Sequence, residues 1–74
     1  MIKTSRKRQN ITQSSLATRT GLSQGYISKL ENTSKVFHSP TVTQIILLAS
    51  ALSLDVYILS KWFIDKELGE IKND

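Results

Sequence analysis

The sequence contains no cysteine, one histidine and three glycines in 74 residues. Without cysteine, no disulfide framework and no thiolate metal site can form, and this absence fits a reducing compartment. His38 has no neighbouring residues that would complete a metal or catalytic site. A phosphate-binding glycine loop and a base–nucleophile pair are also missing. We therefore expect no enzymatic activity and no cofactor.

Long uninterrupted apolar runs are absent as well. The longest candidate is broken by Ser50, Ser53 and Asp55, so it is too short to cross a bilayer. The N-terminus lacks the apolar segment of a secretory signal. We expect a soluble, cytoplasmic protein. A chain of this length can form one domain, residues 1–74, with a single small helical core.

Positive charge is concentrated in the first 40 residues. That part has seven lysines and arginines against Glu31 alone, a net charge of +6, whereas residues 41–74 have three lysines against five acids, a net charge of −2. Such a cationic region suits a polyanionic partner, and binding of that kind weakens steeply with salt. A merely solvated surface would have a similar composition, so charge alone does not establish a nucleic-acid partner.

Residues 13–31, QSSLATRTGLSQGYISKLE, are typical of two short helices joined by a tight turn. The apolar residues recur every three or four positions and so share helix faces; they are Leu16, Ala17, Leu22, Ile27 and Leu30. Ala17 is small enough to let a second helix cross closely. Gly21 falls where the first of these helices ends, a position that usually needs a positive φ. Thr12 and Ser23 are suited to cap the two helices.

The second helix of this pair is expected from about Gln24 to Asn32. Its inner face is formed by Ile27, Leu30 and part of Tyr26. The outer face presents amide, hydroxyl and ammonium groups, together with one residue that has no side chain; these are Gln24, Gly25, Ser28 and Lys29. Glutamine can pair with adenine and lysine with guanine, each contact giving about 1–3 kcal/mol of discrimination.

The pattern QxxLAxxxGLSxxYISKLEN closely resembles the helix-turn-helix of the phage-repressor and Cro-like family, also called the xenobiotic-response-element type. The resemblance extends over roughly residues 2–60. It implies an all-α, compact five-helix fold like that of the λ repressor, with the helix-turn-helix at the second and third helices. Ser5 departs from the family, which usually has an apolar residue there, so the first helix, residues 2–9, is expected to be short or loosely packed.

The resemblance also implies roles for individual residues. Gln13 and Asn32 would contact phosphates, Gln24 and Lys29 would contact base edges, and Arg6 would form a structural ion pair with Glu31. Lys35, in the loop of residues 33–40, is a further phosphate candidate because it directly follows the recognition helix. The full set of expected DNA-binding residues is Gln13, Ser23, Gln24, Gly25, Tyr26, Ser28, Lys29, Asn32 and Lys35.

Two further helices are expected after the loop. The fourth begins at Thr41, which forms a capping box with Gln44, and continues to about Leu52. Its expected core face is Val42, Ile45, Ala49 and Leu52, but Ile46, Leu47 and Leu48 make it apolar over much more of its circumference. The fifth begins after the N-cap Asp55 and runs from about residue 56 to 68, where Gly69 is expected to stop it.

The fifth helix has more apolar residues than the core can cover. Val56, Leu59 and Phe63 can face the core, but Tyr57, Ile58, Trp62, Ile64 and Leu68 cannot all do so. An exposed aromatic and aliphatic patch usually marks an interface. We therefore expect a homodimer contact at Ile58, Trp62 and Leu68, although capping of a small core would also account for Trp62. A two-fold dimer would place two recognition helices about 34 Å apart, which predicts a palindromic site.

These features predict a sequence-specific double-stranded DNA-binding transcriptional regulator, acting as a repressor and a homodimer through the recognition helix Gln24–Asn32. Among family members of this size, the long last helix is similar to that of restriction–modification controllers; phage switches and antitoxins remain open. The alternative is a protein-interaction module or antitoxin whose fourth and fifth helices bind a partner such as a toxin or a polymerase subunit. An interaction module has no need for a polar, cationic face on residues 24–29.

Overall fold

The computed structural model describes residues 1–32 and 39–72, with side chains up to Gly69. The described residues form five helices and no strand, as expected for an all-α protein. The helices are α1 (Ile2–Arg8), α2 (Gln13–Thr20), α3 (Gln24–Glu31), α4 (Val42–Leu52) and α5 (Val56–Lys72). None of them combines the length and apolar character needed to span a membrane.

Local hydrogen bonds fix where the helices begin. The side chains of Thr12 and Ser23 accept the backbone N–H groups of the third helical residues of α2 and α3, at 3.0 and 3.1 Å. Thr41 and Gln44 form the predicted capping box of α4, and Asp55 Oδ1 accepts the N–H groups of the second and third residues of α5. Since these side chains satisfy donors that have no partner within the helix, the predicted starts are confirmed.

The turn between α2 and α3 is built on Gly21. Its φ is +73°, and its N–H donates to the carbonyl oxygen of Ala17 at 2.9 Å. This is the left-handed C-cap expected from the sequence. Ala17 and Leu22 pack against the core on either side of this turn, so the small side chain and the glycine together allow α3 to cross close to α2.

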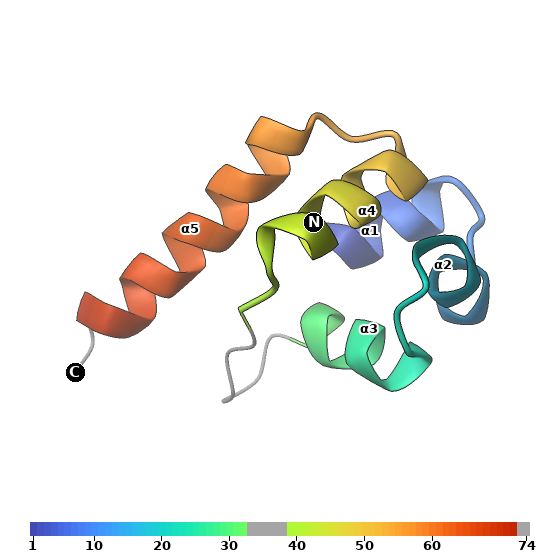
Figure 1. Cartoon of the computed structure of the whole chain (residues 1–74), viewed down its shortest axis with the longest axis horizontal. Helices are drawn as coiled ribbons and strands as arrows, with labels where there is room; N and C mark the ends of the chain where they lie inside the picture. The colour runs from blue at the N-terminus through green and yellow to red at the C-terminus, as the bar shows by residue number, and fades with distance from the viewer. Residues whose placement is uncertain (33–38, 73–74) are drawn as a thin grey trace.

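Figure 1 shows how the helices are arranged around α4. α2 and α3 pack against each other, α4 packs against both α2 and α5, and α1 contacts α3 and α4. α5 lies along the opposite side of the molecule from α2, and its C-terminal half extends beyond the other helices. The outer faces of α3 and α5 are therefore separate surfaces.

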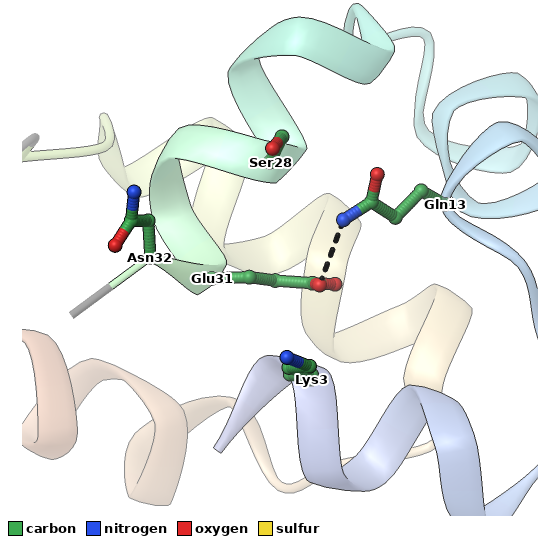
Figure 2. A pocket seen from close by; sticks show the side chains of 5 residues that line it. All are labelled: Lys3, Gln13, Ser28, Glu31 and Asn32. Atoms are coloured by element: carbon green, nitrogen blue, oxygen red, sulfur yellow. Dashed lines mark hydrogen bonds between the residues drawn. The ribbon is translucent and has the colours of Figure 1, made fainter.

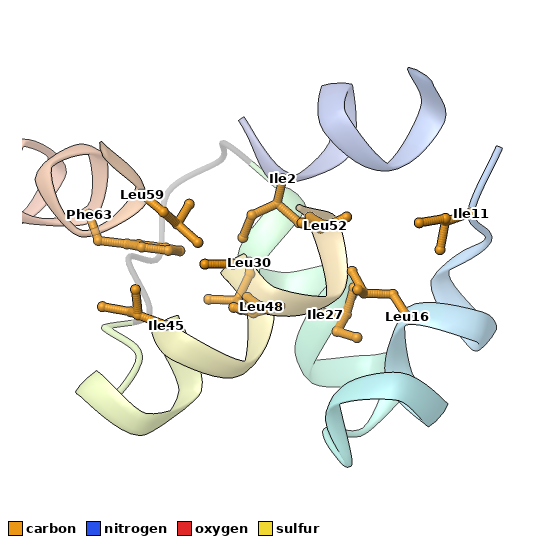
Figure 3. Close-up of a cluster of buried hydrophobic side chains, with 11 residues drawn as sticks. Ile2, Ile11, Leu16, Ile27, Leu30, Ile45, Leu48, Leu52, Leu59 and Phe63 are labelled. Carbon is orange, nitrogen blue, oxygen red and sulfur yellow. The ribbon is translucent and has the colours of Figure 1, made fainter. Parts of the chain in front are cut away.

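The core draws side chains from all five helices (Figure 3). Its largest fully buried members are Ile2, Leu16, Ile27, Leu48, Leu52 and Leu59. Phe63, as predicted, is also buried. α1 is short, with seven residues, but Ile2 and Ser5 are both buried, so α1 is not loosely packed. The small hydroxyl at Ser5 fits where the family usually has an apolar residue.

Two sequence predictions about the last two helices are wrong. Val42 is 74% exposed, whereas Leu48 is fully buried and joins Ile45, Ala49 and Leu52 on the core face of α4. Val42 lies in the first turn of α4, at the edge of the core. Gly69 does not stop α5, which continues to Lys72. Glycine weakens a helix by about 1 kcal/mol relative to alanine, but ends it only when its backbone leaves the helical conformation.

Candidate DNA-binding site

The outer face of α3 is exposed and polar. Ile27 and Leu30 are buried against the core, while Gln24, Gly25, Ser28 and Lys29 lie at the surface. This division follows from the helical period, which separates the two sets of residues by about half a turn. A Cβ added at Gly25 would have no atom within 4 Å, so the backbone at this position is open to a ligand. The expected outer face of the recognition helix is thus available for contact.

Tyr26 differs from its exposed neighbours because it ties α3 to α4. Its side chain is half-buried against the core, and its hydroxyl donates to Gln44 Oε1 at 3.0 Å. Burial raises the pKa of the phenol above its ordinary value. The same Gln44 oxygen accepts the Thr41 N–H at 2.9 Å, so a single amide joins the recognition helix to the capping box of α4.

An ion pair anchors the C-terminal end of α3 to α1. Arg6 Nε donates to Glu31 Oε2 at 2.7 Å, and Arg6 Nη2 donates to Glu31 Oε1 at 3.0 Å. Arg6 Nη1 also donates to the Ile11 carbonyl oxygen at 2.9 Å. Both side chains are nearly buried, with 10% and 4% exposed. This bidentate geometry confirms the ion pair that the family resemblance implied.

The Glu31 carboxylate also receives a hydrogen bond from Gln13, whose Nε2 donates to Oε1 at 3.0 Å. Burial raises the pKa of Glu31, but hydrogen bonds from Arg6 and Gln13 and the charges of Arg6 and Lys3 outweigh it and hold the pKa below its ordinary value. Glu31 is therefore ionised at neutral pH, and its oxygens determine which way the Gln13 amide is turned.

These side chains line a hollow of about 280 Å³ between α1, α2 and the end of α3 (Figure 2). We call it the polar hollow; its lining residues are Lys3, Gln13, Ser28, Glu31 and Asn32. Three of the sequence-predicted contacts, Gln13, Ser28 and Asn32, meet here although they come from two helices. Gln24, Gly25 and Lys29 lie on the exposed face of α3 and do not line the hollow.

A comparison with known families agrees with this geometry. A family model described as helix-turn-helix matches residues 2–59, which covers α1 to α4 and the start of α5. The chain belongs to the Cro/C1-type helix-turn-helix family. No curated protein and no solved structure matches it significantly.

Membership of the Cro/C1-type family makes the chain a DNA-binding transcription regulator. In such domains the second helix of the motif, here α3, enters the major groove with its N-terminal residues nearest the base edges. Gln24 and Gly25 are the first two residues of α3. Ser23 precedes them, and its hydroxyl already accepts the Tyr26 N–H at 3.1 Å, so its first role is to cap the helix.

Two residues of the site stand apart from the sequence prediction. Lys35 lies outside the described residues. Lys3 lines the polar hollow, whereas in the sequence it counted only as one of the seven basic residues among the first 40. Lys3 precedes Arg6 by three residues and so projects from nearly the same side of α1. The predicted ion pair between Arg6 and Glu31 was the available signal, because it turns that side of α1 toward α3.

A second exposed surface lies on α5. Tyr57 is 81%, Ile58 59% and Leu68 45% exposed, and Ile64 is also at the surface. Trp62 is only half-buried and packs against the core, with its ring edge on Phe63 at a centroid distance of 4.9 Å. Lys66 Nζ lies 4.5 Å from the centroid of the Trp62 ring. Of the expected dimer contacts, Ile58 and Leu68 are thus more accessible than Trp62.

Proposed function

We propose that this regulator is a cytoplasmic repressor that binds a palindromic operator as a homodimer. The DNA-binding part of this proposal rests on the polar, exposed outer face of α3. The buried ion pair between Arg6 and Glu31 anchors α3 to α1 and so fixes the position of that face. The residues proposed to contact DNA are Gln13, Ser23, Gln24, Gly25, Tyr26, Ser28, Lys29, Asn32 and Lys35. The chain would repress by occupying its operator and excluding other proteins from that DNA.

The homodimer is supported by the exposed face of α5, which we call the α5 outer face; it consists of Tyr57, Ile58, Lys61, Ile64, Asp65 and Leu68. Tyr57, Lys61, Ile64 and Leu68 are spaced by four, three and four residues, the repeat of a helix that packs along another helix. Lys61 Nζ and Asp65 Oδ2 form an exposed ion pair at 2.8 Å. The face therefore combines apolar residues with two opposite charges.

This face is complementary to itself in an antiparallel arrangement. In a pairing whose two-fold axis crosses each α5 at the height of residue 63, on the exposed side of the helix, Ile58 faces Leu68 of the second copy. The same register places Lys61 opposite Asp65 of the second copy, so the ion pair can form between chains instead of within one. Isologous contacts of this kind generate closed dimers. The remaining exposed edge of Trp62 would lie beside the seam.

Selection of bound sites from a random duplex pool tests the proposed function. We expect an inverted repeat whose half-sites are about one helical turn apart, because a two-fold dimer presents two copies of α3. Enrichment of a single unrepeated half-site would contradict the homodimer but leave sequence-specific binding in place. Failure to enrich any sequence would contradict the proposed function itself.

A second candidate is a protein-interaction module or antitoxin. It is favoured by one observation: α4 has exposed apolar residues of its own, Val42, Ile46 and Leu47, which lie outside the α5 outer face. A toxin or polymerase subunit is the type of partner this candidate requires. Specific duplex binding that falls by orders of magnitude with rising salt would favour the repressor, since protein partners do not release condensed counterions.

A further inference from the structure

The polar hollow brings together residues that the sequence does not place side by side. Gln13 begins α2, Ser28 and Asn32 belong to the second half of α3 and its cap, and Lys3 comes from the first turn of α1. In Figure 2 the Gln13 amide nitrogen reaches toward Glu31, and Lys3 lies on the α1 side of the hollow. The hollow is thus bordered by an amide, a hydroxyl and an ammonium group from three different helices.

The charge of the hollow is set by Lys3. Arg6 pairs with Glu31 through two hydrogen bonds, at 2.7 and 3.0 Å, and so neutralises the carboxylate. Gln13 Nε2 takes up a further lone pair of Glu31 Oε1. Lys3 forms no ion pair with any described residue, although its charge acts on Glu31. Lys3 therefore contributes a positive charge beside the hollow that no described carboxylate pairs with.

The Gln13 amide has a donor left for a ligand. An amide nitrogen has two N–H groups, and Glu31 Oε1 accepts one of those of Gln13. No described residue accepts the second. Gln13 is the first residue of α2, and a helix N-terminus has a partial positive charge. The hollow is thus bordered by hydrogen-bond donors and by positive charge, next to the exposed face of α3.

We propose that the polar hollow is the binding site for one backbone phosphate of DNA and that Lys3 supplies its charge. Gln13 and Ser28 donate hydrogen bonds to the phosphate oxygens, while Glu31 acts as a positioning residue for Gln13 and contacts no DNA. This inference rests on the proposed function, because it assigns to α1 a direct part in the duplex binding that α3 directs. Lys3 then fixes the position of the domain along the backbone without contributing to base choice.

Replacement of Lys3 by glutamine tests the proposal, with Lys7→Gln as the matched control. Lys7 lies one turn further along α1, is exposed, and does not line the hollow. Equilibrium binding to one short duplex is measured across a salt series for the wild type and both variants. Both lysines are exposed, so thermal unfolding of each variant should match the wild type.

For Lys3→Gln we expect the slope of log affinity against log salt to become shallower by about 0.9, the value for one lost phosphate contact, and affinity to fall about five- to tenfold near 0.1–0.15 M salt. The loss should be equal on an operator and on a scrambled duplex. Lys7→Gln should leave the slope unchanged, and Lys3→Arg should restore it.

Three results would overturn the phosphate site. The first is a salt slope that Lys3→Gln leaves unchanged. The second is an equal change of the slope in Lys7→Gln, which would indicate only the general surface potential, and the third is a loss of affinity for the operator alone, which would make Lys3 a base contact. In each case the wild type still binds the duplex. If the wild type itself shows no salt-dependent duplex binding, the proposed function fails instead.

Discussion

At the scale of single residues, Glu31 links the fold to the proposed DNA contacts. Its carboxylate accepts two hydrogen bonds from Arg6 and one from Gln13. The first two hold α1 against α3, while the third orients a side chain proposed to contact phosphate. A change at Glu31 should therefore alter stability and DNA affinity together, whereas a change at an exposed residue of α3 should alter affinity alone.

The lowered pKa of Glu31 predicts how stability depends on pH. A carboxylate whose pKa is lower in the folded than in the unfolded chain stabilises the fold when it is ionised. For Glu31 this contribution is fully present at pH values well above its ordinary pKa of 4.5. That contribution should decline as the pH falls below about 4.5 and vanish once the folded-state carboxylate is protonated. Urea unfolding of the wild type at neutral and acidic pH measures this decline.

Glu31→Gln is the comparison for the same titration, since it keeps the shape and an acceptor oxygen but removes the charge. We expect it to lose about 1–3 kcal/mol of unfolding free energy at neutral pH, because Arg6 is left without a counter-charge. The gap between wild type and variant should narrow on acidification. A constant gap down to the lowest pH would show that Glu31 does not contribute through its ionised form.

Gln24→Ala tests the residue proposed to contact a base. Gln24 is exposed at the first position of α3, so the substitution should leave thermal unfolding almost unchanged. Binding to the selected operator should weaken by about 1–3 kcal/mol, with relaxed choice at one base position. Equal losses on operator and scrambled duplexes would instead assign Gln24 to the backbone.

At the scale of helices and turns, the α2–α3 turn allows a matched comparison of two glycines. Gly21 has φ +73°, while Gly25 lies within α3, and neither has an atom within 4 Å of an added Cβ. Gly21→Ala should therefore destabilise the domain through backbone strain alone, by about 1–2 kcal/mol. Gly25→Ala should stabilise it by up to about 1 kcal/mol through helix propensity.

Thermal or urea unfolding of the two alanine variants decides between backbone strain and a general effect of methyl addition. Opposite signs are expected for Gly21→Ala and Gly25→Ala. Destabilisation by both would mean that the α3 backbone at Gly25 is not regular helix. Duplex binding by Gly25→Ala then shows separately whether the open backbone at this position approaches DNA.

The helix starts could be predicted from sequence because their causes are local. Thr12, Ser23, Thr41 and Asp55 each satisfy N–H groups two or three residues away, and such contacts are encoded in short motifs. Gly21 was predictable for the same reason. The spacing of Ile27 and Leu30 predicted which face of α3 is exposed, and the family resemblance implied which two residues form the buried ion pair.

The features that were predicted wrongly or not predicted depend on where helices end or on how helices pack against each other. Val42 has the right spacing for the core, but the core ends before the first turn of α4. Gly69 could either continue or stop a helix, and no motif distinguishes the two outcomes. Lys3 lines the polar hollow because Arg6 docks α1 on α3, a relation between helices that composition and spacing do not specify.

At the scale of the whole molecule, charge and apolar surface are divided between different parts of the chain. Residues 1–40 have a net charge of +6 and include α3, whereas residues 41–74 have a net charge of −2 and include the exposed apolar residues of α4 and α5. This division suits a protein that binds DNA on one surface and a second copy of itself on another.

Ile58→Glu and Ile46→Glu form a matched test of the proposed dimer. The two isoleucines are similarly exposed, at 59% and 51%, but Ile58 belongs to the α5 outer face and Ile46 to α4. Ile58→Glu should weaken self-association at least tenfold, because a buried charge at a helix seam is costly. Ile46→Glu should leave it unchanged. Sedimentation equilibrium at micromolar concentration measures both.

The opposite pattern, a monomer with Ile46→Glu and a dimer with Ile58→Glu, would move the interface to α4. A wild type that stays monomeric both alone and with DNA would remove the dimer from the account. Unfolding curves of the two variants serve as the control. Both should keep the fold, and Ile58→Glu should lose only the stabilisation that dimerisation adds at the concentration used.

Equilibrium binding of the wild type to its selected duplex and to a scrambled duplex of equal length, across a salt series, tests the central claim most directly. We predict tighter binding to the selected duplex at every salt concentration, with affinity for both falling by orders of magnitude between about 50 and 200 mM salt. Equal affinity for the two duplexes, or binding that does not respond to salt, would contradict sequence-specific DNA recognition by α3.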